Sequence, residues 1–288
     1  MISDNRDKPE QNIQDEPVNS AQAAEKPILK VENLVKQFGD RVVLDGINID
    51  IEQGKTTVII GSSGCGKTVL MKHLIVLERP TSGAVYYKGQ RIDNLMEKEL
   101  ARIRLNYGFC FQMAALFDSL DIYENIIFAL RQHRKITDYS AVDELVKVKL
   151  AMVGMDGFQR HFPANLSGGQ RKRVSLARAI ALDPEIILYD EPTTGLDPIN
   201  SDIINELVLK LQKELAVTSV VVTHDMKSAY KIADRIIMLH KGRIIADGNA
   251  DYIRNHPNPL VQQFIEGKVS ESDLAALRMS GTKFVAQY

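Results

Sequence analysis

Residues 61–68 read Gly61-Ser62-Ser63-Gly64-Cys65-Gly66-Lys67-Thr68 and match the pattern G-x-x-x-x-G-K-[S/T]. They follow a β-branched run at 56–60 that predicts a buried strand, and they precede a helical stretch at 69–77 that stops at Pro80. A strand, a glycine-rich turn and a helix in this order present successive backbone N–H groups above a helix N-terminus, where the partial charge is positive. The stretch therefore predicts a phosphate-binding loop in an α/β fold.

Two side chains at the end of this loop have predicted roles of their own. Lys67 would reach the β- and γ-phosphates of a nucleotide, and the Thr68 hydroxyl would ligate Mg²⁺. The glycines matter because a Cβ atom would block the close approach of a phosphate or forbid a positive φ. All eight residues are thus candidates for nucleotide binding.

Length, composition and charge set limits on the fold and the function. The 288 residues suit one large α/β domain or two small ones, and 44% hydrophobic content supports a core. A net charge of −1 gives no reason to expect nucleic-acid binding. Cys65 and Cys110 form no plausible disulfide framework, which fits a reducing cytosolic compartment. No stretch reaches the roughly 18 apolar residues of a membrane helix, so we expect a soluble chain that can still dock on a membrane protein.

Changes in pattern along the chain predict its organisation. Residues 1–27 are polar and predict a disordered N-terminal tail, with a partner-binding arm as the less favoured alternative. Alternating apolar residues at 28–34 and 41–51 predict β-strands. Residues 113–165 predict a mainly helical insertion, and 249–288 lie outside the α/β core.

Polar side chains follow two of the predicted buried strands. The strand at 186–191 ends in Asp190 and Glu191, where Asp190 is placed to hold Mg²⁺ and Glu191 suits a general base that polarises the attacking water. Gln112 follows the strand at 107–111, at the strand end where α/β sheets bind ligands. Its amide oxygen could bind Mg²⁺ or a nucleophilic water, although Gln112 taken alone fits an ordinary loop residue better.

Three further features surround this predicted centre. His224 follows the strand at 219–223 and could reach the γ-phosphate edge. Phe38 lies on a probable turn, where it could stack on a purine or equally well close the sheet edge. Ser167-Gly168-Gly169-Gln170 precedes the helix at 171–180 and predicts a second anion site, although the basic residues of that helix could simply face solvent. Two such sites make sense if each serves a different copy of the chain.

Taken together, these motifs resemble the ATP-binding-cassette (ABC) ATPases from about Ile28 to Gly248. Phe38 falls where that family places its adenine-stacking aromatic, usually a tyrosine. The remaining motifs occur in the family's order: Walker A at 61–68, the Q-loop glutamine Gln112, the signature motif at 166–170, Walker B with its catalytic carboxylate at Asp190-Glu191, the D-loop residue Asp197 and the switch histidine His224.

The resemblance implies a P-loop NTPase core with an antiparallel β subdomain and a helical subdomain at about 113–165. It implies ATP and Mg²⁺ as ligands and a homodimer that encloses two ATP molecules. Each ATP would lie between Walker A of one copy and the signature motif of the other, with Gln170 and Asp197 at the same interface. Hydrolysis by Glu191 and His224 would reopen the dimer, and the Q-loop would pass the motion to an integral membrane permease.

Within the family, the segments at 111–125, 188–199 and 222–226 look like the ATPases of Mla-type, MCE-associated phospholipid transporters. One departure is Gln170, where that group often has methionine. This resemblance implies phospholipid transport between membranes, and a peripheral position on the cytoplasmic side of the inner membrane. It also implies a permease, an MCE substrate-binding protein and, in some members, a small regulatory subunit, without a nucleic-acid partner.

Two alternatives and one open question accompany this prediction. An ATPase of a polar-solute importer, for example for amino acids, would share every ATP motif. A soluble non-transport ABC protein usually needs tandem cassettes or a coiled-coil insertion, and this chain has neither. Mla-type ATPases use a C-terminal extension for contacts with another copy or a regulator, and 249–288 could do the same or fray.

Overall fold

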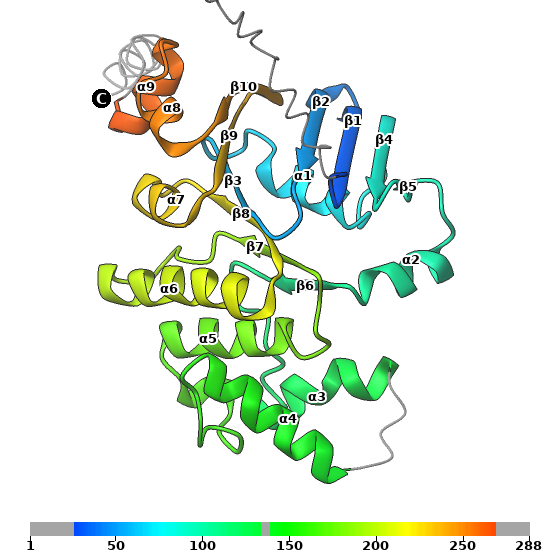
Figure 1. Ribbon diagram of the computed structural model, residues 1–288, viewed down its shortest axis with the longest axis vertical. Helices are drawn as coiled ribbons and strands as arrows, with labels where there is room; N and C mark the ends of the chain where they lie inside the picture. The colour runs from blue at the N-terminus through cyan, green and yellow to red at the C-terminus, as the bar shows by residue number, and fades with distance from the viewer. Residues whose placement is uncertain (1–25, 134–138, 269–288) are drawn as a thin grey trace, which may run out of the picture.

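The computed structural model describes residues 26–133 and 139–268 of the chain. The predicted N-terminal tail lies almost entirely outside the described residues, and the last part of the predicted C-terminal extension, from residue 269, lies outside them as well. Within the described part, two β-sheets occupy the upper half of the molecule and helices α3, α4 and α5 occupy the lower half (Figure 1).

The larger sheet is six-stranded, in the order β10-β9-β3-β8-β7-β6. All its neighbouring strands are parallel except β10, which pairs antiparallel with β9 at the edge. The strands are β3 Thr56–Ile60, β6 Tyr107–Cys110, β7 Ile186–Asp190, β8 Thr218–Thr223, β9 Arg235–His240 and β10 Arg243–Gly248. Since the strands are parallel, β3, β7 and β8 end at one edge of the sheet, where ligands bind in such folds.

The smaller sheet is four-stranded and antiparallel, in the order β2-β1-β4-β5. Its strands are β1 Leu29–Phe38, β2 Arg41–Ile51, β4 Ser82–Tyr87 and β5 Gln90–Arg91. The predicted turn between the first two strands is present, because Phe38 pairs with Arg41 across Gly39 and Asp40. The two sheets together confirm the predicted α/β core with an antiparallel β subdomain.

Helices connect and cover these sheets (Figure 1). Helices α3 and α4 fall within the predicted helical subdomain, whose limits remain a prediction. The helices are α1 Lys67–Leu74, α2 Glu97–Arg104, α3 Ile122–His133, α4 Tyr139–Met152, the short 3₁₀-helix η1 Pro163–Asn165, α5 Gly168–Ala179, α6 Pro198–Leu215, α7 Met226–Ile232, α8 Ala250–Arg254 and α9 Pro259–Glu266.

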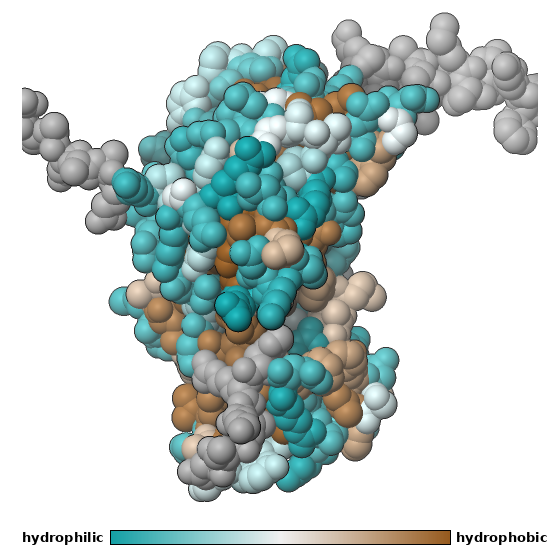
Figure 2. Space-filling model, turned by 90° about the vertical axis from the view of Figure 1, so that its right-hand side faces the viewer, coloured by the Kyte–Doolittle hydropathy of each residue, from teal (hydrophilic) through white to brown (hydrophobic). Residues whose placement is uncertain are grey.

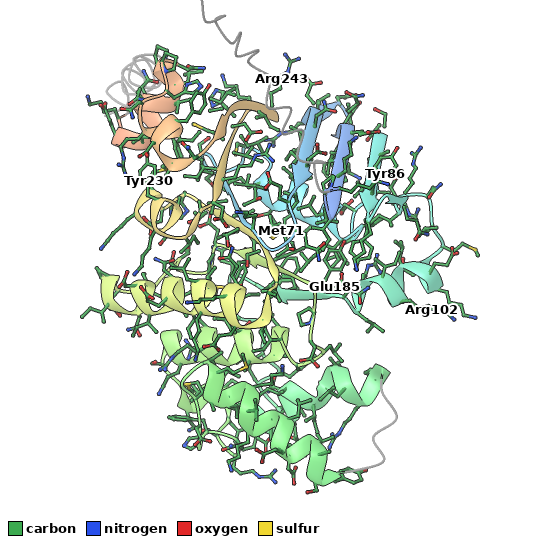
Figure 3. All side chains as sticks on the ribbon, viewed as in Figure 1. Met71, Tyr86, Arg102, Glu185, Tyr230 and Arg243 are labelled. Carbon is green, nitrogen blue, oxygen red and sulfur yellow. The ribbon has the colours of Figure 1, made fainter. Side chains whose placement is uncertain are left out.

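Side chains of the central strand β3 alternate between two hydrophobic clusters. Val58 and Ile60 belong to the cluster that includes α3 to α7, and Ile59 belongs to the cluster of α1 and the antiparallel sheet. Met71 of α1 is fully buried in this second cluster, in the interior of the molecule (Figure 3). The parallel sheet is therefore buried on both faces, which explains its nearly continuous apolar strands.

Helix α1 is shorter than the sequence predicts. It ends at Leu74, because Val76 adopts a left-handed conformation with φ 51°. The N–H of Leu77 donates to Lys72 O at 2.9 Å, and the N–H of Val76 donates to His73 O at 3.0 Å. This pair of bonds is a Schellman motif, which here ends the helix before Pro80.

The chain after β10 returns to the core. Ile253 of α8 and Val261 of α9 are fully buried in the cluster that holds β3 and the helical half. Part of the stretch predicted to lie outside the core, residues 250–266, is thus packed against it. Among residues 26–133 and 139–268, no helix has the length and apolar character to cross a membrane.

Candidate nucleotide-binding site

The loop between β3 and α1 needs glycine at two positions. Gly61 has φ 151°, and a Cβ there would lie 2.2 Å from Leu239 O and 2.7 Å from Cys65 Sγ. Gly66 precedes α1 with φ 112°, and a Cβ there would lie 2.8 Å from Leu44 Cδ2. The loop is therefore packed tightly on its inner side, and its outer side faces the pocket.

Lys67 is fixed above this loop although its side chain is long and flexible. Its Nζ donates to Gly61 O at 2.8 Å and to Ser62 O at 3.1 Å, and it lies 3.9 Å from Glu191 Oε1. The residue is only 7% exposed. A buried ammonium at the mouth of a loop of backbone N–H groups is suited to bind an anion.

Thr68 and Asp190 bring a hydroxyl and a carboxylate together. Thr68 Oγ1 donates to Asp190 Oδ1 at 3.2 Å, from the first turn of α1 to the end of β7. Burial raises the pKa of the Asp190 carboxyl, and the bond from Thr68 opposes that shift. Mg²⁺ is usually held by one or two carboxylates together with phosphate oxygens and water. The pair fits such an ion, provided that a nucleotide supplies the remaining ligands.

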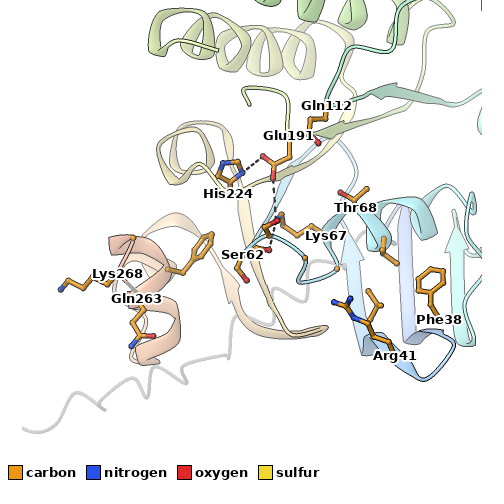
Figure 4. A pocket seen from close by; sticks show the side chains of 17 residues that line it. Phe38, Arg41, Ser62, Lys67, Thr68, Gln112, Glu191, His224, Gln263 and Lys268 are labelled. Carbon is orange, nitrogen blue, oxygen red and sulfur yellow. Dashed lines mark hydrogen bonds and ion pairs between the residues drawn. The ribbon is translucent and has the colours of Figure 1, made fainter. Parts of the chain in front are cut away.

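Glu191 and His224 form the second part of the centre (Figure 4). His224 Nδ1 lies 2.8 Å from Glu191 Oε2, and Thr194 Oγ1 donates to the same oxygen at 3.0 Å. Oε1 faces Lys67 instead. The carboxylate is thus oriented from two sides and buried, while His224 is exposed to the pocket. A carboxylate in this arrangement can accept a proton from a water molecule.

These groups line a pocket of about 840 Å³, within the size range of small-molecule sites. The predicted residues on its walls are Phe38, Ser62, Ser63, Gly64, Gly66, Lys67, Thr68, Gln112, Glu191 and His224. Phe38 is 46% exposed and lies under the Lys36 ammonium, 4.7 Å from ring centroid to Nζ. Gly61 and Cys65 form the packed inner side of the loop, and Asp190 adjoins the pocket through Thr68.

The predicted second anion site lies apart from this pocket. Ser167 caps α5: its Oγ accepts from Gln170 N at 3.2 Å, and its N–H donates to Gln170 Oε1 at 2.8 Å. Asp197 caps α6 in the same way, accepting from Ile199 and Asn200 N–H at 3.0 Å each. None of Ser167, Gly168, Gly169, Gln170 and Asp197 lines the pocket. A single chain therefore does not unite the two predicted anion sites.

The pocket also contains residues that the sequence did not indicate. Arg41 lines the pocket because the two-residue turn between β1 and β2 pairs it with Phe38. Recognising that turn in the sequence could have placed Arg41 beside Phe38. Gln263, on α9, and Lys268, two residues after the end of that helix, also line the pocket. They lie some two hundred positions from the glycine loop, so no local pattern links them to it.

Comparison with known proteins agrees with this geometry. A sequence model described as ABC transporter matches residues 44–194, just over half of the chain. The chain belongs to the ABC transporter family. ATP is therefore the nucleotide of this cassette, and ATP hydrolysis is its activity.

Individual relatives extend the match beyond that region. The cassette is 37% identical over 241 residues to the Haemophilus influenzae intermembrane phospholipid transport system ATP-binding protein MlaF, covering 84% of this chain and 91% of that protein. It is 38% identical over 240 residues to a probable ribonucleotide transport ATP-binding protein, mkl, of Mycobacterium leprae, covering 83% of this chain and 69% of that protein.

A solved cassette has a similar structure. It is the dimeric structure of a post-hydrolysis state of the ATP-binding cassette MJ0796, bound to ADP and phosphate. The TM-score is 0.71 at 34% sequence identity, and the match covers 77% of this chain and 98% of that one.

Proposed function

We propose that this cassette hydrolyses ATP to drive phospholipid transport between membranes. The observation that carries the proposal is the match to MlaF, which extends over 84% of this chain and 91% of that relative. The match to the probable ribonucleotide transporter subunit leaves about a third of that protein uncovered, since it spans 69% of it. The chain thus matches nearly the whole length of the phospholipid transport ATPase but not of the probable ribonucleotide transport ATPase, which favours phospholipid transport.

The residues of the pocket support a division of roles. Lys67 and the N–H groups of the glycine loop bind the phosphates, and the Phe38 ring stacks on the base. Thr68 and Asp190, with Gln112 facing the same pocket, would hold Mg²⁺. The ion would neutralise charge on the β- and γ-phosphate oxygens. Glu191 accepts the proton of the attacking water, and His224 orients Glu191 through the 2.8 Å contact.

The separation of the two anion sites supports a homodimer. Ser167 to Gln170 and Asp197 cap helices whose N-termini lie outside the pocket of their own chain. In a two-fold dimer, the N-terminus of α5 would complete the partner copy's ATP site, and the interface would be the same patch on both copies. The dimeric state of the MJ0796 cassette is in keeping with this arrangement.

An apolar surface next to Gln112 supports a membrane partner. The side chains of Phe111, Met113, Phe117 and Phe128 are each at least 40% exposed, and Met113 reaches 86%. Figure 2 shows hydrophobic residues at the surface in the lower, helical half of the molecule. Exposed apolar side chains gathered in this way mark interaction sites. We assign this surface to contact with an integral membrane permease, which would hold the cassette peripherally on the cytoplasmic side of the inner membrane. An MCE substrate-binding protein and, as in some members of the group, a small regulatory subunit would belong to the same complex.

The test uses the tagged Glu191→Gln protein, isolated with ATP from the membranes of its own host. Protein and lipid mass spectrometry would then identify what accompanies it. A multi-span permease with an MCE-domain protein and bound phospholipid is the expected result. A permease with a periplasmic solute-binding protein and no lipid would contradict the phospholipid class. Ribosomes or DNA-repair factors without a membrane partner would contradict transport altogether.

A further inference from the structure

A buried cation lies on helix α5, outside the motifs described above. Lys172 is only 5% exposed, and its Nζ donates to two backbone carbonyls, Gln112 O and Glu191 O, the latter at 3.2 Å. Burial lowers the pKa of Lys172, while nearby Cys110, Asp190 and Glu191 act in the opposite direction. Burying a charge is unfavourable unless the charged group is well hydrogen-bonded. These two hydrogen bonds offset part of the cost of burying the ammonium.

The two carbonyls belong to residues that line the ATP pocket. Gln112 follows β6 and Glu191 follows β7, and these strands are neighbours with Cys110 paired to Tyr189. One ammonium therefore bridges the ends of two adjacent strands just where their pocket-lining residues begin. It does so from the helix that Ser167 caps.

The hydrogen bond from Lys172 goes to a residue whose backbone is strained. Glu191 has φ 49°, a left-handed conformation that is unfavourable for a residue with a side chain. Its N–H donates to Val222 O at 2.9 Å, and its carbonyl accepts from Lys172. The strained residue is thus held on both sides, by β8 and by α5.

The Q-loop, residues 112–115, also has a strained backbone whose carbonyls accept hydrogen bonds from side chains of α5. Ala114 and Ala115 have φ 61° and 49°, again left-handed and without glycine. Arg178 Nη2 donates to Ala114 O at 2.9 Å, and Nη1 donates to Ala115 O at 2.6 Å. Two cations of α5 therefore hold three carbonyls of the segment 112–115.

We infer that Lys172 is a positioning residue for ATP hydrolysis, which fixes the backbones of Glu191 and Gln112 relative to each other and to helix α5. The inference rests on the proposed roles of Glu191 and Gln112. Helix α5 carries the signature residues at its N-terminus. A shift of that end of the helix would therefore move Lys172, and through its side chain the backbone of the general base Glu191. The hydrogen bonds of Lys172 go to Gln112 O and Glu191 O, whereas those of Lys67 go to the glycine loop. We therefore expect the affinity for the nucleotide to depend little on Lys172.

The test replaces Lys172 by methionine, which keeps the length of the side chain and removes the donors. We expect kcat to fall about 10- to 100-fold, because small displacements of a catalytic group have effects of this size. The Kd for ATP should change less than about twofold. Lys172→Arg retains the donors and should recover most of the rate. Lys213→Met, on the exposed face of α6, is the matched control and should behave as the unaltered protein.

A double-variant comparison separates positioning from a merely structural role. In the Glu191→Gln background, Lys172→Met should lower the single-turnover rate by much less than the roughly 10- to 100-fold expected with Glu191 present, because most of the effect of Lys172 is transmitted through Glu191. An additive loss, an unchanged kcat in Lys172→Met, or a parallel loss of ATP affinity would each overturn the inference. Lys172→Ala is the second variant, and failure of both to fold would overturn it as well. Normal turnover by Glu191→Gln alone would instead refute the proposed role of Glu191.

Discussion

At the scale of single residues, the site depends on side chains that hold one another in place. Glu191 has one oxygen beside His224 and Thr194, and the other beside the Lys67 ammonium. Its backbone is strained and is held by Val222 and Lys172. Strain of this kind persists only where the surroundings fix it, and it concentrates at functional sites. The geometry therefore supports Glu191 as the residue on which hydrolysis depends.

Replacing Glu191 by glutamine should lower kcat for ATP hydrolysis about 100- to 10,000-fold, the usual contribution of a general base. The amide cannot accept the proton of water, although it fits the same space. Steady-state phosphate release at saturating ATP measures the effect. Glu214→Gln, on an exposed part of α6, should leave the rate unchanged. Normal turnover in Glu191→Gln would show that another residue polarises the water.

Lys67→Ala should weaken ATP binding about 10- to 100-fold, because hydrogen bonds to charged groups contribute roughly 1.5–3 kcal/mol. Calorimetric titration with ATP gives the affinity directly. Lys72→Ala removes an exposed lysine from the same helix and serves as the control. Equal affinities for the two variants would refute the assignment of Lys67 to the phosphates.

Much of the site could be predicted from the sequence, because many of its residues stand in a short, recognisable sequence pattern. Asp190 ends a recognisable strand, the glycine loop, Glu191 and His224 each follow one, and parallel strands bring their ends to one edge of the sheet. Lys172 and Arg178 could not be found in this way. Their partners are backbone carbonyls sixty or more positions away along the chain, or the carbonyl of Glu191 after β7, and a carbonyl has no signature in the sequence.

At the scale of elements, the turn between β3 and α1 is the most constrained part. Gly66 combines a left-handed backbone with tight packing against Leu44 and Val43. Gly39 has a left-handed backbone as well, but a Cβ there would meet nothing within 4 Å. Gly66 therefore adds tight packing, and a φ of 112° against 55° at Gly39, to the positive φ that both glycines share.

Gly66→Ala should lower the free energy of unfolding by about 1–3 kcal/mol more than Gly39→Ala, the usual effect of overpacking. Urea denaturation of both variants, followed by circular dichroism, measures the difference. Similar losses in the two proteins would mean that the neighbours of Gly66 move aside freely.

A buried carboxylate just after β5 stabilises the pairing of β4 and β5. Asp93 accepts from the N–H of Val85 at 2.8 Å and from Arg91 Nη2 at 2.9 Å. Burial works to raise the pKa of Asp93, but these hydrogen bonds outweigh it and the pKa lies below its usual value. A carboxyl with a depressed pKa stabilises the fold above its unfolded pKa of about 3.9, and this contribution is lost as the pH falls.

Asp93→Asn should therefore destabilise the protein at pH 7, and the difference from the unaltered chain should shrink as the pH is lowered towards about 3. The amide keeps one acceptor oxygen but loses the charge opposite Arg91. Unfolding free energies at a series of pH values provide the measurement. A difference that stays constant with pH would show that the charge of Asp93 contributes nothing.

At the scale of the whole molecule, the residues proposed to bind one ATP lie in two separate places on the chain. The Walker residues line the pocket, and the signature residues cap a helix elsewhere on the surface. The sequence suggested this division, because two anion sites for one nucleotide make sense if each serves a different copy of the chain. The packing of α8 and α9 against the core could not be predicted, since a few apolar residues in a short helix do not specify their partner.

The measurement that tests this account most directly is the mass of the Glu191→Gln protein in solution with Mg²⁺ and ATP. Light scattering should show twice the 32.2 kDa mass of one chain with ATP, and a single chain with ADP. Gly168→Glu in the same background should bind ATP and remain a monomer, because it places a negative charge at the second anion site. A Glu191→Gln protein that is saturated with ATP and still monomeric would contradict the account.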